Sequence, residues 1–327
     1  MLLLITELIA RIYSPFFVPI HDYLMLYKRD RMVQKAKPFE NAILIGDSRA
    51  MSIDARALST HLTQEFQRPF RVYNYAFPAV GAEGYYLFLK KFLQHNQPPE
   101  IVFFCVRPLM LAGNALVEKN GTHSHKHRFF SLFSINEYRE TLNLRFFLKS
   151  LPLEIREHST LITYRASIES VIKSFLKGVP LDDKTYKHAI LESMHGGMPL
   201  EGPRLINIEE IQKDYEWLDD LFVDPDALFW FEKFLQLAKD HQITVAVFNI
   251  PSVKDVYEKR EQNGSNAVYL AAMAELETKY GLKAIEPLLE IYEYKYFADT
   301  NHLNDFGDKQ FLMQLTQRLN QTSLEKH

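Results

Sequence analysis

The chain has 327 residues, of which 47% are hydrophobic and 24% are charged, and this balance is typical of a globular protein with a sizeable core. The formal net charge of −3 gives no general electrostatic attraction to nucleic acid, so we expect no nucleic-acid partner. The single cysteine, Cys105, excludes a disulfide framework and a CxxC metal or redox site.

Residues 1–38 form an N-terminal segment with an ambiguous pattern. The stretch 1–20 is apolar, but Glu7, Arg11 and two prolines interrupt it, so it is a poor membrane-spanning helix. A basic stretch, "YKRDRMVQKAK", follows at 27–37. The segment predicts either an amphipathic helix packed on the protein or an anchor at a membrane surface. The anchor alternative favours a cell-envelope or membrane-associated location over a cytoplasmic one.

The remainder, 39–327, alternates short apolar runs with helical patterns. Apolar runs that end in turn residues predict strands at 42–46, 71–77, 100–106, 243–251 and 282–287. Helical periodicity is found at 53–66, 82–96, 225–241, 265–280 and 305–320. This alternation indicates an α/β fold with a parallel sheet. We expect a three-layer α/β/α sandwich of five strands in the order 2-1-3-4-5.

One long segment interrupts the alternation between about 112 and 226. It contains helical patterns and a loop, and no strong strand. Because it is too long for a simple connection, we interpret it as a helical insertion. We expect it to cap the edge of the sheet where ligands bind in open α/β folds.

The first strand runs directly into a hydroxyl group, in "ILIGDSRAM" at 43–51. Ser48 lies where a strand gives way to a helix, a place where side chains stand clear of the sheet and backbone N–H groups are unpaired. Such a serine can attack a carbonyl group. The alternative is that Asp47 and Ser48 only cap the following helix.

A second polar group precedes the last predicted helix, in "FADTNHLNDFGDKQF" at 297–311. Asp299 and His302 are three residues apart, so on one loop the carboxylate can reach Nδ1 of the imidazole and leave Nε2 as a base. The alternative is an ordinary polar loop in which Asn304 or Asp305 caps the helix.

Together, Ser48, Asp299 and His302 complete a Ser/Asp/His set in that chain order. "GDSR" at 46–49 and "DTNH" at 299–302 resemble the first and last blocks of the SGNH, or GDSL-type, hydrolase superfamily. The resemblance implies a flavodoxin-like fold with Ser48 as nucleophile, His302 as base and Asp299 as the residue that orients it. It implies no metal and no organic cofactor.

The middle blocks depart from the superfamily pattern. Asn74 matches the asparagine of the second block and is a candidate substrate-binding residue. It is followed by Ala79 where a glycine is usual, and the nearest glycine is Gly81, so the N–H of either Ala79 or Gly81 is a candidate oxyanion donor. Gly81 is otherwise a plain helix-entry residue. Arg107 stands where the third block has an asparagine. It replaces that oxyanion donor, binds an anionic substrate group, or forms a salt bridge at the strand end.

These residues predict a serine-dependent esterase that acts on an O-acyl ester, with a carbohydrate-linked ester as one candidate. The degenerate third block and the apolar N-terminus resemble those of divergent branches of the SGNH superfamily, the DltD-like and alginate-acetylation proteins. An O-acyltransferase for a cell-envelope polysaccharide and a non-catalytic envelope binding protein therefore stay open. The alternating histidines at 122–128 lack a strand pattern and a neighbouring carboxylate, so we interpret them as a basic loop and expect no metal site.

Overall fold

The computed structural model describes residues 27–28, 31–32, 39–77, 81–111, 193–197 and 223–322. The chain divides into two units, one of Met1–Met32 with His123–Glu192 and the other of Val33–Thr122 with Ser193–His327. In the first unit the described residues, 27–28 and 31–32, are helical. The expected N-terminal anchor, the alternating histidines and most of the insertion at 112–226 lie outside the described residues. All elements below belong to the second unit.

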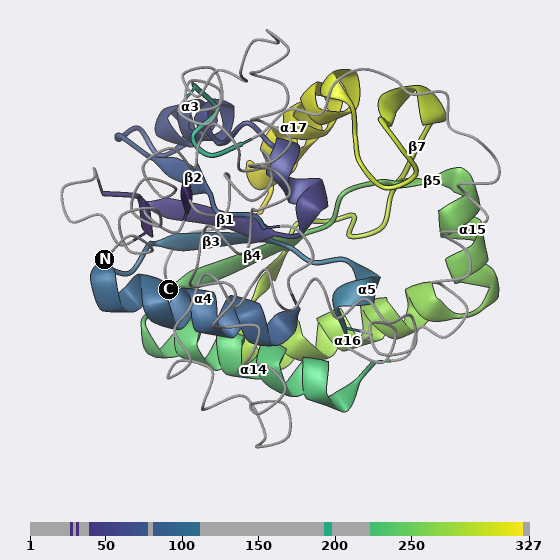
Figure 1. Ribbon diagram of the computed structural model, residues 1–327, viewed down its shortest axis with the longest axis horizontal. Coiled ribbons are helices and arrows are strands. Elements are labelled where there is room, and N and C mark those ends of the chain that lie inside the picture. The colour runs from purple at the N-terminus through teal and green to yellow at the C-terminus, as the bar shows by residue number, and fades with distance from the viewer. Residues whose placement is uncertain are drawn as a thin grey trace, which may run out of the picture. The chain divides into compact units, whose positions relative to one another are not determined.

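A five-stranded parallel sheet forms the centre of this unit (Figure 1). Its strands are β1 (Ala42–Gly46), β2 (Val72–Asn74), β3 (Ile101–Cys105), β4 (Thr244–Phe248) and β6 (Lys283–Ala284). They lie in the order β2-β1-β3-β4-β6. The predicted α/β class and parallel sheet are confirmed, and the weak apolar run at 282–287 contains the fifth strand of the sheet.

The register of the central strands brings their carboxyl ends to one edge. Gly46 of β1 lies beside Cys105 of β3, which lies beside Phe248 of β4. Every residue of β1 and β3 is buried, as two-sided burial of a parallel sheet requires. Segments that directly follow β1, β3 and β4 therefore meet in space although they are far apart in the sequence.

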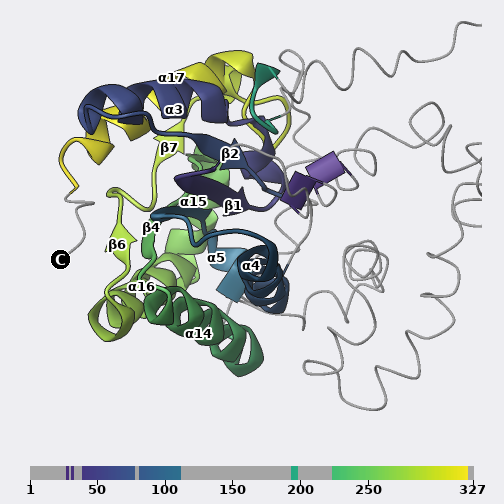
Figure 2. The same cartoon turned by 90° about the vertical axis from the view of Figure 1, so that its left-hand side faces the viewer.

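Within the described residues there are five long helices and four shorter ones; the long helices cover the sheet and lie close to the ranges that the sequence predicts. They are α3 (Ala55–Glu65), α4 (Ala82–His95), α14 (Pro225–Asp240), α16 (Ser265–Tyr280) and α17 (Asp305–Leu319). Helices α3 and α17 lie on one side of the sheet, and α4, α14 and α16 lie on the other (Figure 2). Four shorter helices are η1 (Ser48–Ser52), α5 (Pro108–Leu111), α15 (Lys254–Gln262) and η2 (Tyr294–Tyr296).

Aromatic side chains fill the layer between the sheet and the helices α4 and α14. Phe104 of β3 packs against Tyr85 of α4, with ring centroids 4.7 Å apart, and against Phe234 of α14 at 5.0 Å. All three side chains are fully buried. Each such side chain contributes about 1.5–3 kcal/mol on burial, so this layer fixes both helices on β3.

Besides the shorter helices, two further features of the fold were not predicted. A second, two-stranded parallel sheet joins β5 (Ser252–Val253) to β7 (Ile291–Tyr292), and two-residue strands are too short to give a periodic pattern. The segment 193–197 lies along the edge of β2, where the Asn74 N–H donates to the carbonyl of His195 at 2.8 Å. None of the helices within the described ranges is both long and apolar enough to cross a membrane.

Candidate active site

Ser48 is presented by a tight turn at the carboxyl end of β1. Gly46 has a φ of +156°, and a Cβ there would lie 2.7 Å from the Cβ of Cys105 and 2.9 Å from that of Ala50. A glycine therefore lets the chain turn closely against β3 and into η1. Asp47 then caps η1, because its Oδ1 accepts the N–H of Arg49 at 3.1 Å. Ser48 is the first residue of η1 and is partly exposed.

The fully buried side chain of Asn74 supports this turn from β2. Its amide group donates to the carbonyls of Ala50 at 2.8 Å and Ile53 at 3.0 Å, and its Oδ1 accepts the N–H of Ala76. Both amide hydrogens are thus used within the fold. Asn74, which the sequence placed among the substrate-binding candidates, holds η1 in place and has no donor left for a substrate.

His302 and Asp299 lie on a short loop before α17. Phe297 and Leu303 form an antiparallel bridge that closes the loop. Asn304 caps α17 by accepting two N–H groups at 3.0 Å and donates back to the carbonyl of Lys295 at 2.8 Å. A Cβ at Gly307 would lie 2.1 Å from the carbonyl oxygen of Tyr296, so only glycine permits this approach of helix and loop. These contacts fix the position of the imidazole.

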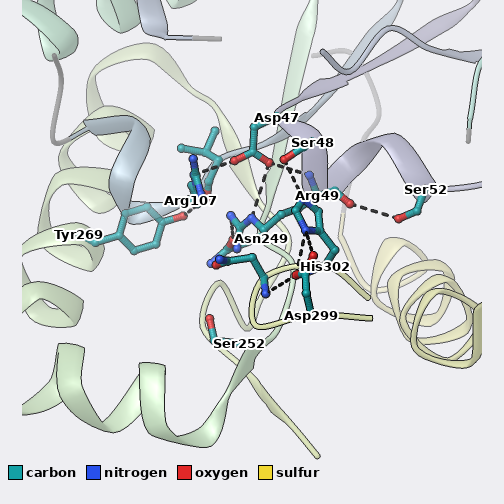
Figure 3. Close-up of polar contacts among 12 residues, drawn as sticks. Asp47, Ser48, Arg49, Ser52, Arg107, Asn249, Ser252, Tyr269, Asp299 and His302 are labelled. Atoms are coloured by element: carbon teal, nitrogen blue, oxygen red, sulfur yellow. Dashed lines mark hydrogen bonds and ion pairs between the residues drawn. The ribbon is translucent and has the colours of Figure 1, made fainter. Parts of the chain in front are cut away.

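The three predicted side chains lie in one hydrogen-bonded chain (Figure 3). Nδ1 of His302 is 2.9 and 2.8 Å from the two carboxylate oxygens of Asp299. Nε2 of His302 is 2.8 Å from Oγ of Ser48. Since the carboxylate accepts the proton on Nδ1, the tautomer leaves Nε2 as the acceptor of the Ser48 hydroxyl. This geometry is that of a nucleophile, a base and an orienting acid.

The charge of Asp299 is stabilised by its partners. Partial burial raises the pKa of this carboxyl group, but the hydrogen bond from His302 and the backbone N–H groups of Asn301 and His302 outweigh it, so the pKa is lowered. Asp299 is therefore an anion at neutral pH. This negative charge can stabilise the positive charge that an imidazole gains when it acts as a general base.

A second buried network lies beside the serine, around Asp47. The Asp47 carboxylate is 1% exposed, and its Oδ2 is 2.6 Å from Nε of Arg107 while its Oδ1 is 3.6 Å from Nε of Arg49. Arg49 donates from Nη2 to Oδ1 of Asn249 at 2.9 Å. Burial raises the pKa of Asp47, but Arg107 and Arg49 outweigh it, so the pKa is lowered. The network joins segments that follow β1, β3 and β4.

The predicted oxyanion donors differ in their exposure and in whether their N–H groups are already hydrogen-bonded. Arg107 forms the strand-end salt bridge with Asp47, yet its side chain is 23% exposed and its terminal nitrogens bond to no described residue. Gly81 is exposed and caps α4. Ala79 lies outside the described residues. The N–H of Ser48 enters no hydrogen bond within the described part of the chain, so it is available to a ligand.

Sequence reasoning missed two features of the site. Arg49 was not assigned any role, although it follows the candidate nucleophile directly and its side chain is buried. Ser52 was also missed: its Oγ donates to Oδ1 of Asp308 at 2.8 Å and so connects η1 to α17. A buried arginine in a turn is unusual, but only contacts distant in the sequence reveal its partners.

Among the described residues, no group of three or more His, Cys, Asp or Glu side chains is arranged to hold a metal ion. The fold and the site together define an α/β protein with a Ser-His-Asp constellation at the carboxyl edge of a parallel sheet. The chain belongs to the family described as "Protein of unknown function (DUF1574)", which matches residues 24–306 and so includes all three side chains. A comparison with curated proteins finds no match to this chain.

Proposed function

We propose that this protein is a serine-dependent esterase that acts on an O-acyl ester. The observation that carries the proposal is the unbroken chain from Asp299 through His302 to Ser48, with 2.8 Å between Nε2 and Oγ. In an ordinary polar loop we would not expect an imidazole to be hydrogen-bonded to a serine on another element. The partial exposure of Ser48 at the carboxyl edge of the sheet fits access by a substrate.

The proposed reaction has two stages. In the first, Oγ of Ser48 attacks the acyl carbonyl carbon while its proton passes to Nε2 of His302, and Asp299 stabilises the imidazolium. The C–O bond to the alcohol then breaks, and His302 returns the proton to the leaving oxygen. In the second stage, water attacks the acyl-enzyme with His302 again as base, which releases the acid and regenerates Ser48.

The tetrahedral oxyanion needs hydrogen-bond donors beside Ser48. The free N–H of Ser48 is the first candidate, and the N–H of Ala79 or Gly81 is the second, as the resemblance to SGNH hydrolases implies. Arg107 is proposed as the third, in place of the asparagine of that superfamily, because its terminal nitrogens are unpaired while Asp47 holds its Nε. One such donor typically contributes about 10²–10³-fold to the rate.

The arrangement of the elements agrees with this proposal. The strand order β2-β1-β3-β4-β6 and the helices on both sides of the sheet fit a flavodoxin-like, three-layer SGNH fold. Membership of that superfamily, and a place in its branches that act on cell-envelope polymers, are parts of the same proposal.

A fluorophosphonate probe tests the proposed nucleophile directly. We expect stoichiometric labelling of the wild-type chain, located by mass spectrometry on the peptide with Ser48, and hydrolysis of p-nitrophenyl acetate. Ser48→Ala should abolish both, because it removes the attacking oxygen. Ser59→Ala is the matched control, since it removes a buried hydroxyl of α3 that bonds only to backbone groups, and it should label normally.

The same experiment distinguishes the proposed esterase from the alternative functions. Absence of labelling in folded wild-type protein, or labelling at another residue, would contradict the proposal and favour a non-catalytic binding protein. If Ser48 is labelled, product analysis with an added glycan separates the two enzymes. Free acid as the product indicates a hydrolase, and acyl groups on the glycan indicate an O-acyltransferase.

A further inference from the structure

Two arginine side chains, Arg49 and Arg107, lie beside Asp47, and a third, Arg260, is close enough for their positive charges to act on it. Arg49 lies in η1, Arg107 follows β3, and Arg260 lies in α15. Arg49 donates to Asn249, and Arg260 donates from Nη1 to Oγ of Ser252 at 3.2 Å. The two acceptors, Asn249 and Ser252, lie three residues apart in the segment that follows β4. Arg107 and Arg49 share the carboxylate of Asp47.

Arg260 is the least expected member of this arginine cluster. It is 4% exposed, and its Nε has no hydrogen-bond partner within the described part of the chain. No carboxylate of the described residues lies within salt-bridge distance of its guanidinium group, and its one side-chain hydrogen bond goes to the neutral Ser252. Burial lowers the pKa of Arg260 to about 9, and the positive charges of Arg49 and Arg107 contribute to that decrease. Burial of a guanidinium group without a counterion has a large desolvation penalty, so a compensating negative charge is expected nearby.

Among the described residues, the charge balance of the arginine cluster is positive. The cluster contains three guanidinium groups, and Asp47 supplies one negative charge, which Arg49 and Arg107 share. Asp299 directs both carboxylate oxygens to His302 and does not pair with any of these arginines. A ligand with a negative charge would therefore complete the cluster, and Arg107, with its 23% exposed side chain, is the member that it can reach.

We propose that the Arg49–Arg107–Arg260 cluster is an anion subsite, which selects esters that carry a carboxylate or phosphate group near the acyl bond. In such a complex Arg107 contacts the anion and not the oxyanion, since its two unpaired terminal nitrogens form a fork that matches a carboxylate or a phosphate group. Arg49 and Arg260, which are 3% and 4% exposed, supply positive potential from a region of low dielectric constant. The inference rests on the proposed esterase function for its substrate, but the binding of the anion does not require the chemistry.

Binding is tested first, on the Ser48→Ala variant, with inorganic phosphate and with succinate as separate probes. We expect at least one of them to bind in calorimetric titration and to raise the midpoint of thermal unfolding, and the tighter one identifies the chemical group. Adding Arg260→Gln should weaken that binding at least tenfold. Arg56→Gln is the control, because it removes the same charge from an exposed position on α3 and should leave binding unchanged.

Selectivity is tested with two esters that differ only in charge, 4-acetoxybenzoate and the neutral 4-acetoxybenzamide. We expect the wild-type protein to prefer the anionic ester at least tenfold in kcat/KM. Arg260→Gln should bring the ratio close to one, and Arg260→Lys should restore part of it. Arg260→Met is a second neutral variant if the glutamine does not fold.

The outcomes separate the two proposals. If neither probe binds, or if both bind Arg260→Gln and Arg260→Met as tightly as the parent, the anion subsite is wrong even where the neutral ester is hydrolysed. If the probes bind with the expected dependence on Arg260 but no ester reacts, the subsite stands and the esterase function is wrong.

Discussion

At the scale of single residues, Asp299 combines two roles in one carboxylate. Its Oδ1 accepts the N–H groups of Asn301 and His302, both at 2.8 Å, which shapes the loop. Both oxygens also face Nδ1 of His302, which sets the tautomer. A substitution that keeps an oxygen for the loop but loses the charge can therefore separate folding from catalysis.

Asp299→Asn makes this separation. Its side-chain oxygen can still accept the backbone N–H groups, so we expect an unchanged free energy of unfolding within about 1 kcal/mol. We expect kcat on p-nitrophenyl acetate to fall by roughly 10³–10⁴-fold, because the imidazolium loses its counterion and the tautomer is no longer enforced. Steady-state kinetics and urea unfolding measure the two effects. Retention of kcat within about tenfold would count against a triad.

Gly46 gives a second prediction at this scale. In Gly46→Ala the new Cβ would meet Cβ atoms of Cys105 and Ala50 at 2.7 and 2.9 Å, at a φ of +156°. We expect destabilisation of about 2–4 kcal/mol in urea unfolding, from the clash and the strained backbone together. Gly264→Ala is the comparison, since it also has a positive φ, +77°, but no atom within 4 Å. An equal cost at both positions would mean that close packing at Gly46 is unimportant.

At the scale of elements, the contact between η1 and α17 sets the geometry of the site. Ser52 is the last residue of η1, and Asp308 lies in the first turn of α17, just after the loop that holds His302. Their 2.8 Å hydrogen bond joins the element of the nucleophile to the element of the base. The pKa of Asp308 is raised to about 7, mainly by burial and further by the negative charge of Asp305. The hydrogen bond from the Ser52 hydroxyl acts in the opposite direction and lowers it.

This raised pKa predicts a pH dependence of stability. The unfolded chain loses the Asp308 proton near its ordinary pKa of 3.8, while the folded chain keeps it until about 7. Below the lower value the contribution to stability is fully present, and it is lost as the pH rises through the folded pKa. In Asp308→Asn this loss is absent. Between about pH 5 and about pH 8 the free energy of unfolding of the wild type should therefore fall by roughly 2.5 kcal/mol relative to that of the variant.

Urea unfolding at the two pH values measures this difference. Asp305→Asn is the control, because Asp305 is an exposed residue in the same helical turn, and its substitution should leave most of the pH dependence in place. The interpretation is wrong if Asp308→Asn loses stability with pH as steeply as the wild-type protein.

At the scale of the whole molecule, strand length and pairing differ between the two sheets. Strand β3 pairs on both sides, with β1 and β4, and each of its residues is buried. The strands β5, β6 and β7 have two residues each. Local opening of such short strands requires few broken contacts, whereas exposure of β3 requires the layers on both sides to separate.

Hydrogen exchange tests this difference. We expect the amide hydrogens of β3, and then those of β1 and β4, to exchange most slowly, and those of β5 and β7 at least about tenfold faster. Exchange followed by mass spectrometry on peptides that cover these strands is sufficient. Equal protection of the β5–β7 sheet and β3 would show that the second sheet opens only with global unfolding.

Local patterns in the sequence were sufficient to predict the fold class and most element boundaries. The apolar runs at 42–46 and 100–106 and the helical pattern at 265–280 are local signals, and the structure has strands and a helix there. Ser48, Asp299 and His302 also carried a local signal, because each occurs at the end of an apolar run or before a helix. Turn residues and periodicity require no knowledge of distant contacts.

Which side chains contact one another depends on the folded arrangement of the strands and could not be read from local patterns. The Ser48–His302 contact spans 254 residues, and the Arg49–Asn249 contact spans 200. The sequence proposed the first and missed the second, and it could not anticipate that Asn74 would be fully used in holding η1. The physical reason is that the parallel register aligns the strand ends, so partners are set by which strands are neighbours and not by spacing along the chain.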